Sequence, residues 1–363
     1  MYCLIRVNAH PQLGNGHLMR CLTLARIAHG RGYKPVLVLS DLPGVPTGFI
    51  REAGFNYVLL PAANETQDAT NFKALIQDLD APCRVVVDVY AFAAIWHRIV
   101  YPLCEYLLVI DDLANRTYCC DVLLDQTPGR SADDYKPLVN NAAQVYAGCE
   151  HALLAPEFFA AVNDAKRVRE HYCAQKRLPR LLVSLGGTDP KELSHIWFHL
   201  LAPVANEFAD ITFLLASNAV GLNSLAKKIA IHQQTTGGIE LLVDVRHMPQ
   251  LLLEHDLAIG GAGVSALERA VLGLPSLLLT LADNQIIQAQ ALITIGCARN
   301  LGDWQQVPSI SAQQAALAVV LAAKNNYVDY KTMSQQGFNM IASEHPYQAI
   351  NEFLTHQRAE ANA

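Results

Sequence analysis

The sequence predicts an α/β protein with two doubly wound domains, each built on a parallel sheet. Apolar segments of strand length alternate with longer helical patterns along most of the 363 residues. Each half of the chain also begins with a strand and a glycine-bearing loop, with Gly14 and Gly16 in the first half and Gly186 and Gly187 in the second. Doubly wound domains bind ligands at the carboxyl ends of their strands, so we expect the two domains to face each other across a ligand-binding cleft.

The spacing of apolar residues predicts the individual elements. Continuous apolar runs at 85–87 and 181–183 are typical of parallel strands that are buried on both faces. We predict strands at 2–7, 35–39, 57–60, 84–88, 106–110 and 122–125, and then at 180–184, 211–216, 239–243, 257–259 and 276–279. We predict helices at 17–31, 67–79, 92–103, 190–207, 221–231, 264–273 and 285–295.

The domain boundary is expected where the strand pattern stops. The stretch 160–176 is rich in charged residues and carries no strand pattern, so it is interpreted as a linker. We therefore predict an N-terminal domain over 1–160 and a C-terminal domain over 177–330. Helices over 331–363 are expected to pack back on the N-terminal domain.

Composition and charge exclude several classes of protein. Hydrophobic residues make up 52% of the chain and charged residues 17%, which excludes a disordered protein. The formal net charge of −6 argues against nucleic acid as a partner. No apolar run reaches the ~18 residues of a membrane span, so we expect no stable membrane association. The nine cysteines include no Cys-x-x-Cys pair, which favours reduced thiols in the cytoplasm. The oligomeric state stays open.

The segment 14–20 links the first strand to the first helix. A glycine loop that leads into a helix presents unpaired N–H groups and the positive end of the helix dipole, both of which favour an anion. His17 stands at this helix start, and Arg20 lies one turn later on nearly the same face. Arg20 can contact a phosphate or form an ion pair with an acidic neighbour. The predicted substrate-binding residues here are Gly14, Asn15, Gly16 and Arg20.

A second glycine loop, 260–263, lies between a predicted strand and a predicted helix. Glycines let the backbone approach a diphosphate closely, and the helix start supplies N–H donors. Glu268 lies about one turn inside this helix, where its carboxylate can accept hydrogen bonds from ribose hydroxyls. A tight turn followed by a surface glutamate is the alternative. The predicted nucleotide-binding residues here are Gly261, Ala262, Gly263, Val264, Ser265 and Glu268.

Other polar residues follow predicted strands. Asp88 and Tyr90 come at the end of a buried strand, where they can contact a sugar, although Asp88 can also cap a helix. Asn284 and Gln285 begin a helix and suit hydrogen bonds to sugar hydroxyls or acetamido groups, with simple capping as the alternative. The pair 111–112 is expected to form a cap or turn. The histidines lack His-Glu-x-x-His spacing, so we expect no metal and no cofactor.

These motifs occur in the order of a known family. Its N-terminal motif matches Arg6, Gly14, Gly16, His17, Arg20, Leu24 and Ala25, and its later segments match 110–114, 123–126, 182–190, 258–260, 268–269, 272–276 and 282–285. Over residues 1–300, the chain resembles the bacterial UDP-2,4-diacetamido-2,4,6-trideoxy-β-L-altropyranose hydrolases of the pseudaminic acid pathway. It departs from their pattern at Asn8, Val89 and Ala155, mainly in the half that would face the sugar.

The resemblance implies a GT-B fold of two Rossmann-like domains, similar to that of the UDP-N-acetylglucosamine transferase that makes peptidoglycan lipid II. It implies that the C-terminal domain holds the UDP of a UDP-sugar substrate, with the uracil ring beside Arg246, His247 and Met248. Gly186 and Gly187 then belong to the sugar and diphosphate site.

The resemblance also makes His17 the catalytic general base, which activates water and releases UDP and the free sugar with inversion. An imidazole suits that role because it can accept a proton near neutral pH. Two alternatives stay open. One is a UDP-sugar glycosyltransferase of the same fold, and the other is a UDP-sugar-binding protein that has lost the sugar chemistry.

Overall fold

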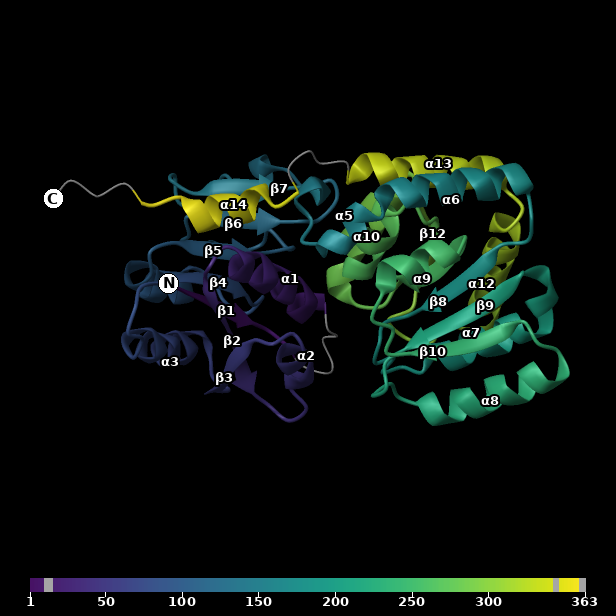
Figure 1. Cartoon of the computed structure of the whole chain (residues 1–363), viewed down its shortest axis with the longest axis horizontal. Coiled ribbons are helices and arrows are strands. Elements are labelled where there is room, and N and C mark those ends of the chain that lie inside the picture. The colour runs from purple at the N-terminus through teal and green to yellow at the C-terminus, as the bar shows by residue number, and fades with distance from the viewer. Residues whose placement is uncertain (10–15, 342–345, 359–363) are drawn as a thin grey trace. The chain divides into compact units, whose positions relative to one another are not determined.

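The computed structural model describes residues 1–9, 16–341 and 346–358, which form two compact units (Figure 1). Unit 1 contains the chain up to Leu153 and the C-terminal helix α14 (Gln348–Thr355). Unit 2 begins at Leu154 and extends through helix α13 (Tyr327–Met340). None of the helices in these described ranges is long and apolar enough to cross a membrane.

A seven-stranded parallel sheet in the order β3-β2-β1-β4-β5-β6-β7 forms the centre of unit 1. The chain enters at β1 and adds strands outward on both sides, which is the predicted doubly wound arrangement. The strands are β1 (Tyr2–Val7), β2 (Lys34–Asp41), β3 (Asn56–Pro61), β4 (Cys83–Asp88), β5 (Leu107–Ile110), β6 (Val122–Asp125) and β7 (Gln144–Ala147). The helices are α1 (Gly16–Gly30), α2 (Thr47–Glu52), α3 (Glu65–Gln77), α4 (Ala94–Val100) and α14.

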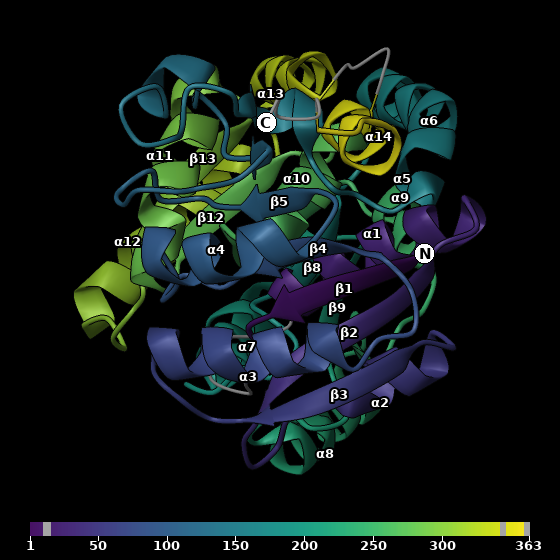
Figure 2. The same cartoon turned by 90° about the vertical axis from the view of Figure 1, so that its left-hand side faces the viewer.

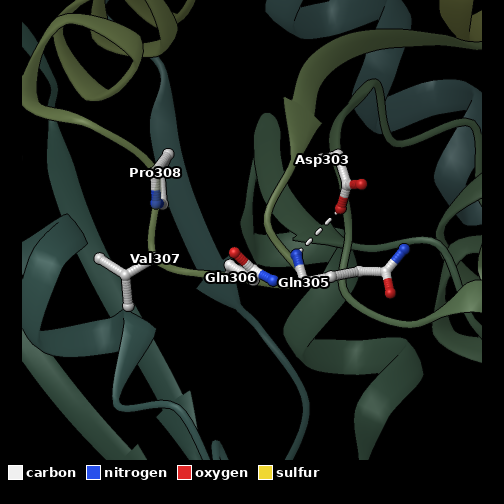
Figure 3. A pocket seen from close by; sticks show the side chains of 5 residues that line it. All are labelled: Asp303, Gln305, Gln306, Val307 and Pro308. Carbon is white, nitrogen blue, oxygen red and sulfur yellow. Dashed lines mark hydrogen bonds between the residues drawn. The ribbon is translucent and has the colours of Figure 1, made fainter.

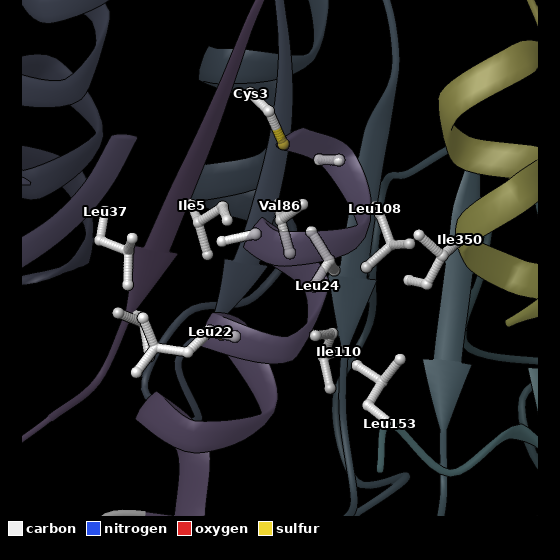
Figure 4. Packing of buried hydrophobic residues seen from close by; sticks show 14 of the residues in the cluster. Cys3, Ile5, Leu22, Leu24, Leu37, Val86, Leu108, Ile110, Leu153 and Ile350 are labelled. Atoms are coloured by element: carbon white, nitrogen blue, oxygen red, sulfur yellow. The ribbon is translucent and has the colours of Figure 1, made fainter. Parts of the chain in front are cut away.

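Both faces of this sheet are buried, as expected for a parallel sheet. Successive residues of β1 point to opposite faces, so Ile5 packs with α1 and α14 while Leu4 packs with α3 and α4. Figure 4 shows the first of these cores, where Leu24 of α1 and Ile350 of α14 approach the strands. Helices α3 and α4 lie together over the other face (Figure 2).

Unit 2 has a six-stranded parallel sheet in the order β10-β9-β8-β11-β12-β13, also doubly wound. Its strands are β8 (Arg180–Ser184), β9 (Asp210–Leu215), β10 (Ile239–Val243), β11 (Leu257–Gly261), β12 (Ser276–Thr280) and β13 (Ala298–Asp303). Its helices are α5 (Pro156–Ala160), α6 (Val162–Gln175), α7 (Leu193–Leu201), α8 (Leu222–Thr235), α9 (Met248–Glu254), α10 (Val264–Val271), α11 (Ile286–Ile295), α12 (Ile310–Ala323) and α13. Stacked Trp197 and Trp304, with ring centroids 5.2 Å apart, belong to its core.

The expected linker over 160–176 is instead helix α6 of unit 2, and the boundary between the units lies between Leu153 and Leu154. The high content of charged residues does not indicate a linker here, because these residues cover the outer side of an amphipathic helix. Its inner side buries Ala165, Arg169 and Tyr172.

The expectation for the C-terminal helices is also corrected in part. Helix α13 belongs to unit 2, where it packs against α6 and α10. Of the two described helices beyond residue 326, α14 packs in unit 1, with Ile350 and Phe353 fully buried. The guanidinium of Arg84 on β4 donates to the carbonyls of Phe353 and His356, which fastens the end of α14 to the sheet.

Candidate functional site

A histidine and a buried aspartate from neighbouring elements meet in unit 1. His17 lies in the first turn of α1, and its Nδ1 is 2.7 Å from Oδ1 of Asp88, the last residue of β4. A carboxylate oxygen only accepts, so Nδ1 carries the proton and Nε2 is the basic nitrogen of the neutral ring. Among the described residues, Nε2 has no hydrogen-bond partner.

Arg20 holds the other side of the Asp88 carboxylate. Its Nε lies 2.7 Å from Oδ2 and its Nη2 lies 2.6 Å from Oδ1, while Nη1 lies 2.8 Å from both oxygens of Asp112. Burial disfavours the charged form of Asp88, but Arg20 and then His17 outweigh burial and hold the pKa of Asp88 well below its usual range. Asp88 is therefore an anion at any physiological pH. Of the two roles left open by the sequence, Arg20 forms the ion pair.

Tyr90 completes this cluster. Its hydroxyl donates to Oδ2 of Asp112 at 2.5 Å, and its ring packs edge-on against His17 with centroids 4.6 Å apart. Burial and then the Asp112 carboxylate raise the pKa of Tyr90 well above its usual range, so the phenol stays neutral. The ring of His17 is thus fixed by Asp88 at one nitrogen and by Tyr90 at one side.

The predicted site residues of unit 1 other than His17 and Arg20 differ in what the structure shows of them. Gly14 and Asn15 lie outside the described residues, and Gly16 begins α1. Asp88 and Tyr90, predicted to contact a sugar, are brought to His17. Asp88 is fully buried and accepts from His17 and Arg20, so it neither caps a helix nor presents its carboxylate to solvent.

Three further charged residues of unit 1 take part in buried or partly buried contacts. Arg6, part of the N-terminal motif, forms a buried ion pair with Asp68 in which Nη2 and Oδ2 are 2.6 Å apart. Asp111 accepts from the amides of Leu113 and Ala114 and so forms the expected turn. Its neighbour Asp112 instead belongs to the histidine cluster, which the sequence did not indicate.

In unit 2, the glycine loop 260–263 lies at the carboxyl end of β11 and leads into α10. Side chains hold this loop from two sides: Oε1 of Gln285 accepts from the amide of Ala262 at 3.2 Å, and Nε2 of Gln288 donates to the carbonyl of Gly263 at 2.7 Å. Gly263 is the N-cap of α10, and no side chain caps the helix. The first turn of α10, with Val264 and Ser265, therefore keeps amide donors for a ligand.

The remaining predicted residues of unit 2 vary in their surroundings. Glu268 is half-buried, and burial, opposed by Arg269, raises its pKa to about 7. The side-chain oxygen of Gln285 is occupied by the amides of Leu281 and Ala262, whereas Asn284 is exposed. Arg246 and His247 are exposed just before α9, which begins at Met248.

The loop after β8 contains Gly186, whose φ of +96° favours glycine, and Gly187, where a Cβ would lie 3.3 Å from Cβ of Ala216. Further along this loop, Nζ of Lys191 donates to the carbonyls of Leu281 and Gln305. Lys191 thus joins the loops that follow β8, β12 and β13 at one edge of the sheet.

A cavity of about 380 Å³ lies in the last of these loops (Figure 3). The amide of Gln305 donates to Asp303 at 2.9 Å within its wall. The lining residues are Asp303, Gln305, Gln306, Val307 and Pro308.

Known proteins resemble the chain more closely in fold than in sequence. No family model matches it. The spore coat polysaccharide biosynthesis protein SpsG of Bacillus subtilis is 29% identical over 175 residues, 47% of either chain. The chain spans about half the length of the curated relatives it matches.

The structure of MurG from Acinetobacter baumannii superposes with a TM-score of 0.64 at 12% identity, covering 98% of both chains. The chain has the GT-B fold. The structure of Alr3699/HepE from Anabaena in complex with UDP-glucose matches with a TM-score of 0.54 at 13% identity, again over 98% of both chains. The predicted fold class, with two Rossmann-like parallel-sheet domains, is confirmed.

Proposed function

We propose that the protein is an enzyme that cleaves the bond between a sugar and UDP, with His17 as the general base. The arrangement of His17 and Asp88 carries this proposal. A buried, ionised carboxylate at Nδ1 fixes the tautomer in which Nε2 accepts a proton, and it stabilises the imidazolium that forms. A histidine that served only as a phosphate ligand would not need this buried anion.

The proposed reaction is a displacement at the anomeric carbon of the sugar. Nε2 of His17 takes the proton of an attacking O–H group while the oxygen forms a bond to the anomeric carbon. The bond from that carbon to the diphosphate breaks, and its electron pair leaves with UDP. A diphosphate is stabilised as an anion, so no protonated carboxyl is needed to expel it, in contrast to glycosidases. Attack opposite to the leaving group inverts the anomeric centre.

Unit 2 is the proposed holder of UDP. The glycine loop 260–263 and the first turn of α10 supply backbone donors for the diphosphate, and the half-buried carboxyl of Glu268 suits the ribose hydroxyls. The UDP-glucose bound to the Anabaena protein of similar fold supports a UDP-sugar as the ligand class.

We favour a hydroxyl group of an acceptor sugar as the attacking group, which makes the protein a glycosyltransferase. The partial match to a spore coat polysaccharide biosynthesis protein and the GT-B fold support this choice. Water is the second candidate, because the motifs of the sequence resemble those of the UDP-diacetamido-trideoxy sugar hydrolases.

The deciding experiment incubates the protein with a panel of UDP-sugars, including UDP-N-acetylglucosamine and a UDP-diacetamido-trideoxy sugar, without and with oligosaccharide acceptors. Release of UDP and free sugar is followed by NMR. Release that depends on an acceptor supports transfer, and stoichiometric release without one supports hydrolysis. Tight UDP binding with no turnover in any mixture would support a UDP-sugar-binding protein and contradict the proposal that the protein is an enzyme.

The variant His17→Ala tests the role of His17 as the general base in the same assay. It should lose kcat by ~10²–10⁴-fold, the usual contribution of a general base, while its affinity for UDP stays near that of the wild type. Turnover at the wild-type rate by this variant would contradict the proposed mechanism.

A further inference from the structure

Two arginines of unit 2, Arg169 and Arg269, are equally buried, with exposed fractions of 2% and 1%. Within the described parts of the chain, neither forms an ion pair, and both donate only to neutral oxygens. A buried charge without compensation is costly, so the surroundings of each guanidinium are informative.

The charge of Arg169 is compensated by the fold itself. Its guanidinium donates to the carbonyls of Leu252 and His255 at the end of α9, and to the carbonyl of Leu272 at the end of α10. The carboxyl ends of helices carry partial negative charge from unpaired carbonyls. Two such ends therefore surround this cation.

Arg269 lies in the opposite environment. Its side chain extends back along α10 toward the helix start, where Nη1 is 3.4 Å from Oγ of Ser265 and Nη2 is 2.8 Å from the carbonyl of Gly261. Nε donates to Oγ of Ser276 at 2.9 Å. The start of a helix carries partial positive charge, so the dipole of α10 adds to the charge of Arg269 instead of offsetting it.

The guanidinium also lies directly against the glycine loop. A Cβ at Gly260 would be 2.7 Å from Nη1 and 2.8 Å from Cζ of Arg269, so only glycine leaves room for it. The nearest acid along the chain, Glu268, forms no ion pair with Arg269 among the described residues, and because burial raises its pKa to about 7, it offsets the charge of the guanidinium only in part at neutral pH.

We propose that Arg269 is a positioning residue that supplies a positive charge without an ion-pair partner beneath the loop 260–263, and so makes this loop selective for a diphosphate over a neutral nucleoside. The inference rests on the proposed function, in which this loop binds UDP. A diphosphate above the loop receives hydrogen bonds from the start of α10 and neutralises the charge below it. Arg269 also holds the Gly261 carbonyl inward, away from an anion.

The test compares the affinities for UDP and for uridine, measured by calorimetry on the full chain. Arg269→Gln should weaken UDP binding on the order of tenfold or more, because a unit charge near a partly buried anion contributes at least that factor. Its affinity for uridine should stay the same. Arg169→Gln is the matched control, since it removes an equally buried guanidinium from the other end of α10 and should leave the ratio of the two affinities unchanged.

Equal losses of UDP and uridine affinity in Arg269→Gln would show a merely structural role and overturn the inference, as would an unchanged UDP affinity. In both cases the wild type would still prefer UDP, and the proposed function would stand. Wild-type protein that does not bind UDP would overturn both.

Arg269→Lys tests the charge even if the glutamine variant does not fold. Burial lowers the pKa of Arg269 to about 10, so the arginine stays charged up to pH 9, whereas a lysine starts from a lower pKa and loses its charge within this range when it is buried in the same place. The preference of this variant for UDP over uridine should therefore fall as the pH rises from 6 to 9, relative to the wild type at each pH. A preference that follows the wild type across this range would overturn the role of the charge.

Discussion

Oδ1 of Asp88 lies 2.7 Å from Nδ1 of His17, and the same carboxylate is held on its far side by Arg20. The two residues are joined because β4 lies beside β1 in the sheet, and α1 follows β1 in the chain. Burial raises the pKa of Asp88, but Arg20 and His17 together outweigh burial, so the anion beside His17 is maintained in part by a second residue of the same helix. The tautomer that leaves Nε2 of His17 free to accept a proton thus depends on Asp88, and the charge of Asp88 depends in turn on Arg20.

Asp88→Asn should separate the electrostatic role of this carboxylate from its packing. The amide has the same shape but no charge, so it cannot stabilise an imidazolium, and its NH2 group can donate to Nδ1 and so favour the wrong tautomer of His17. We expect kcat to fall by ~10²–10⁴-fold in the reaction with a UDP-sugar, with UDP affinity near that of the wild type. Steady-state kinetics and calorimetry measure the two quantities.

The control for Asp88→Asn is Asp125→Asn. Asp125 is equally buried and ends β6, but its partners are Thr127, Tyr135 and the guanidinium of Arg130, with no contact to His17 among the described residues. Burial and then Asp112 raise its pKa to about 6, so the neutral amide resembles a form that this site already tolerates. Its kcat should stay close to that of the wild type. A similar loss of kcat in both variants would mean that Asp88 acts only through the stability of unit 1.

Glu268 should make stability depend on pH. Its pKa is about 7 in the folded protein because of burial, and about 4.3 in an unfolded chain. Between these values the folded state binds the extra proton, so the free energy of unfolding falls as the pH rises from about 4.3 to about 7. Glu268→Gln cannot titrate at this position. The free energy of unfolding of this variant, relative to that of the wild type, should therefore rise between a pH of about 4.3 and about 7 and then level off.

Urea unfolding at a series of pH values measures this difference for Glu268→Gln. UDP binding provides the second readout, because an ionised carboxylate accepts hydrogen bonds from ribose hydroxyls more strongly than a neutral one. Wild-type affinity for UDP should increase as the pH rises through 7, and the variant should lack this increase. A pH dependence that is identical in both proteins would exclude Glu268 as the titrating group.

Interactions that are local in sequence were predictable, and those that depend on strand order were not. His17 was found because a glycine loop and a helix start lie next to each other in the chain. Asp112 was missed because its partner Arg20 is 92 residues away and meets it only through the order β1-β4-β5. Strands β7 and β13 were missed because their apolar signal is weak: β7 has a run of three apolar residues, 145–147, and polar residues separate Ala298 from Leu301 in β13.

Helix α14 should contribute to the stability of unit 1 although it is the last helix of the chain. Phe353 is fully buried there, with its ring centroid 6.5 Å from that of Tyr106. Phe353→Ala should lower the free energy of unfolding by about 3–5 kcal/mol, the usual cost of emptying such a site. Thr355→Ala, an exposed position of the same helix, should change it by less than about 0.5 kcal/mol. Equal denaturation midpoints for the two variants would show that α14 does not stabilise the unit.

Gly337 should be required for the close contact between α13 and α10. A Cβ at this position would lie 2.6 Å from the carbonyl oxygen of Ala270, a backbone atom that cannot rotate away. Alanine normally stabilises a helix by about 1 kcal/mol relative to glycine, but the forced separation of two packed helices costs about 1–3 kcal/mol. Gly337→Ala should therefore lower the unfolding midpoint. Because α10 carries Glu268 and begins at the loop 260–263, its displacement should weaken UDP binding as well.

The control for Gly337→Ala is Gly48→Ala in helix α2, where a Cβ would meet no atom within 4 Å. That variant should be neutral or stabilised by up to about 1 kcal/mol, with UDP binding unchanged. Thermal unfolding and calorimetry with UDP measure both effects. An unfolding midpoint of Gly337→Ala at or above that of the wild type would mean that α13 can move away from α10 without cost, and the close packing of the two helices would not be what holds α10 in place.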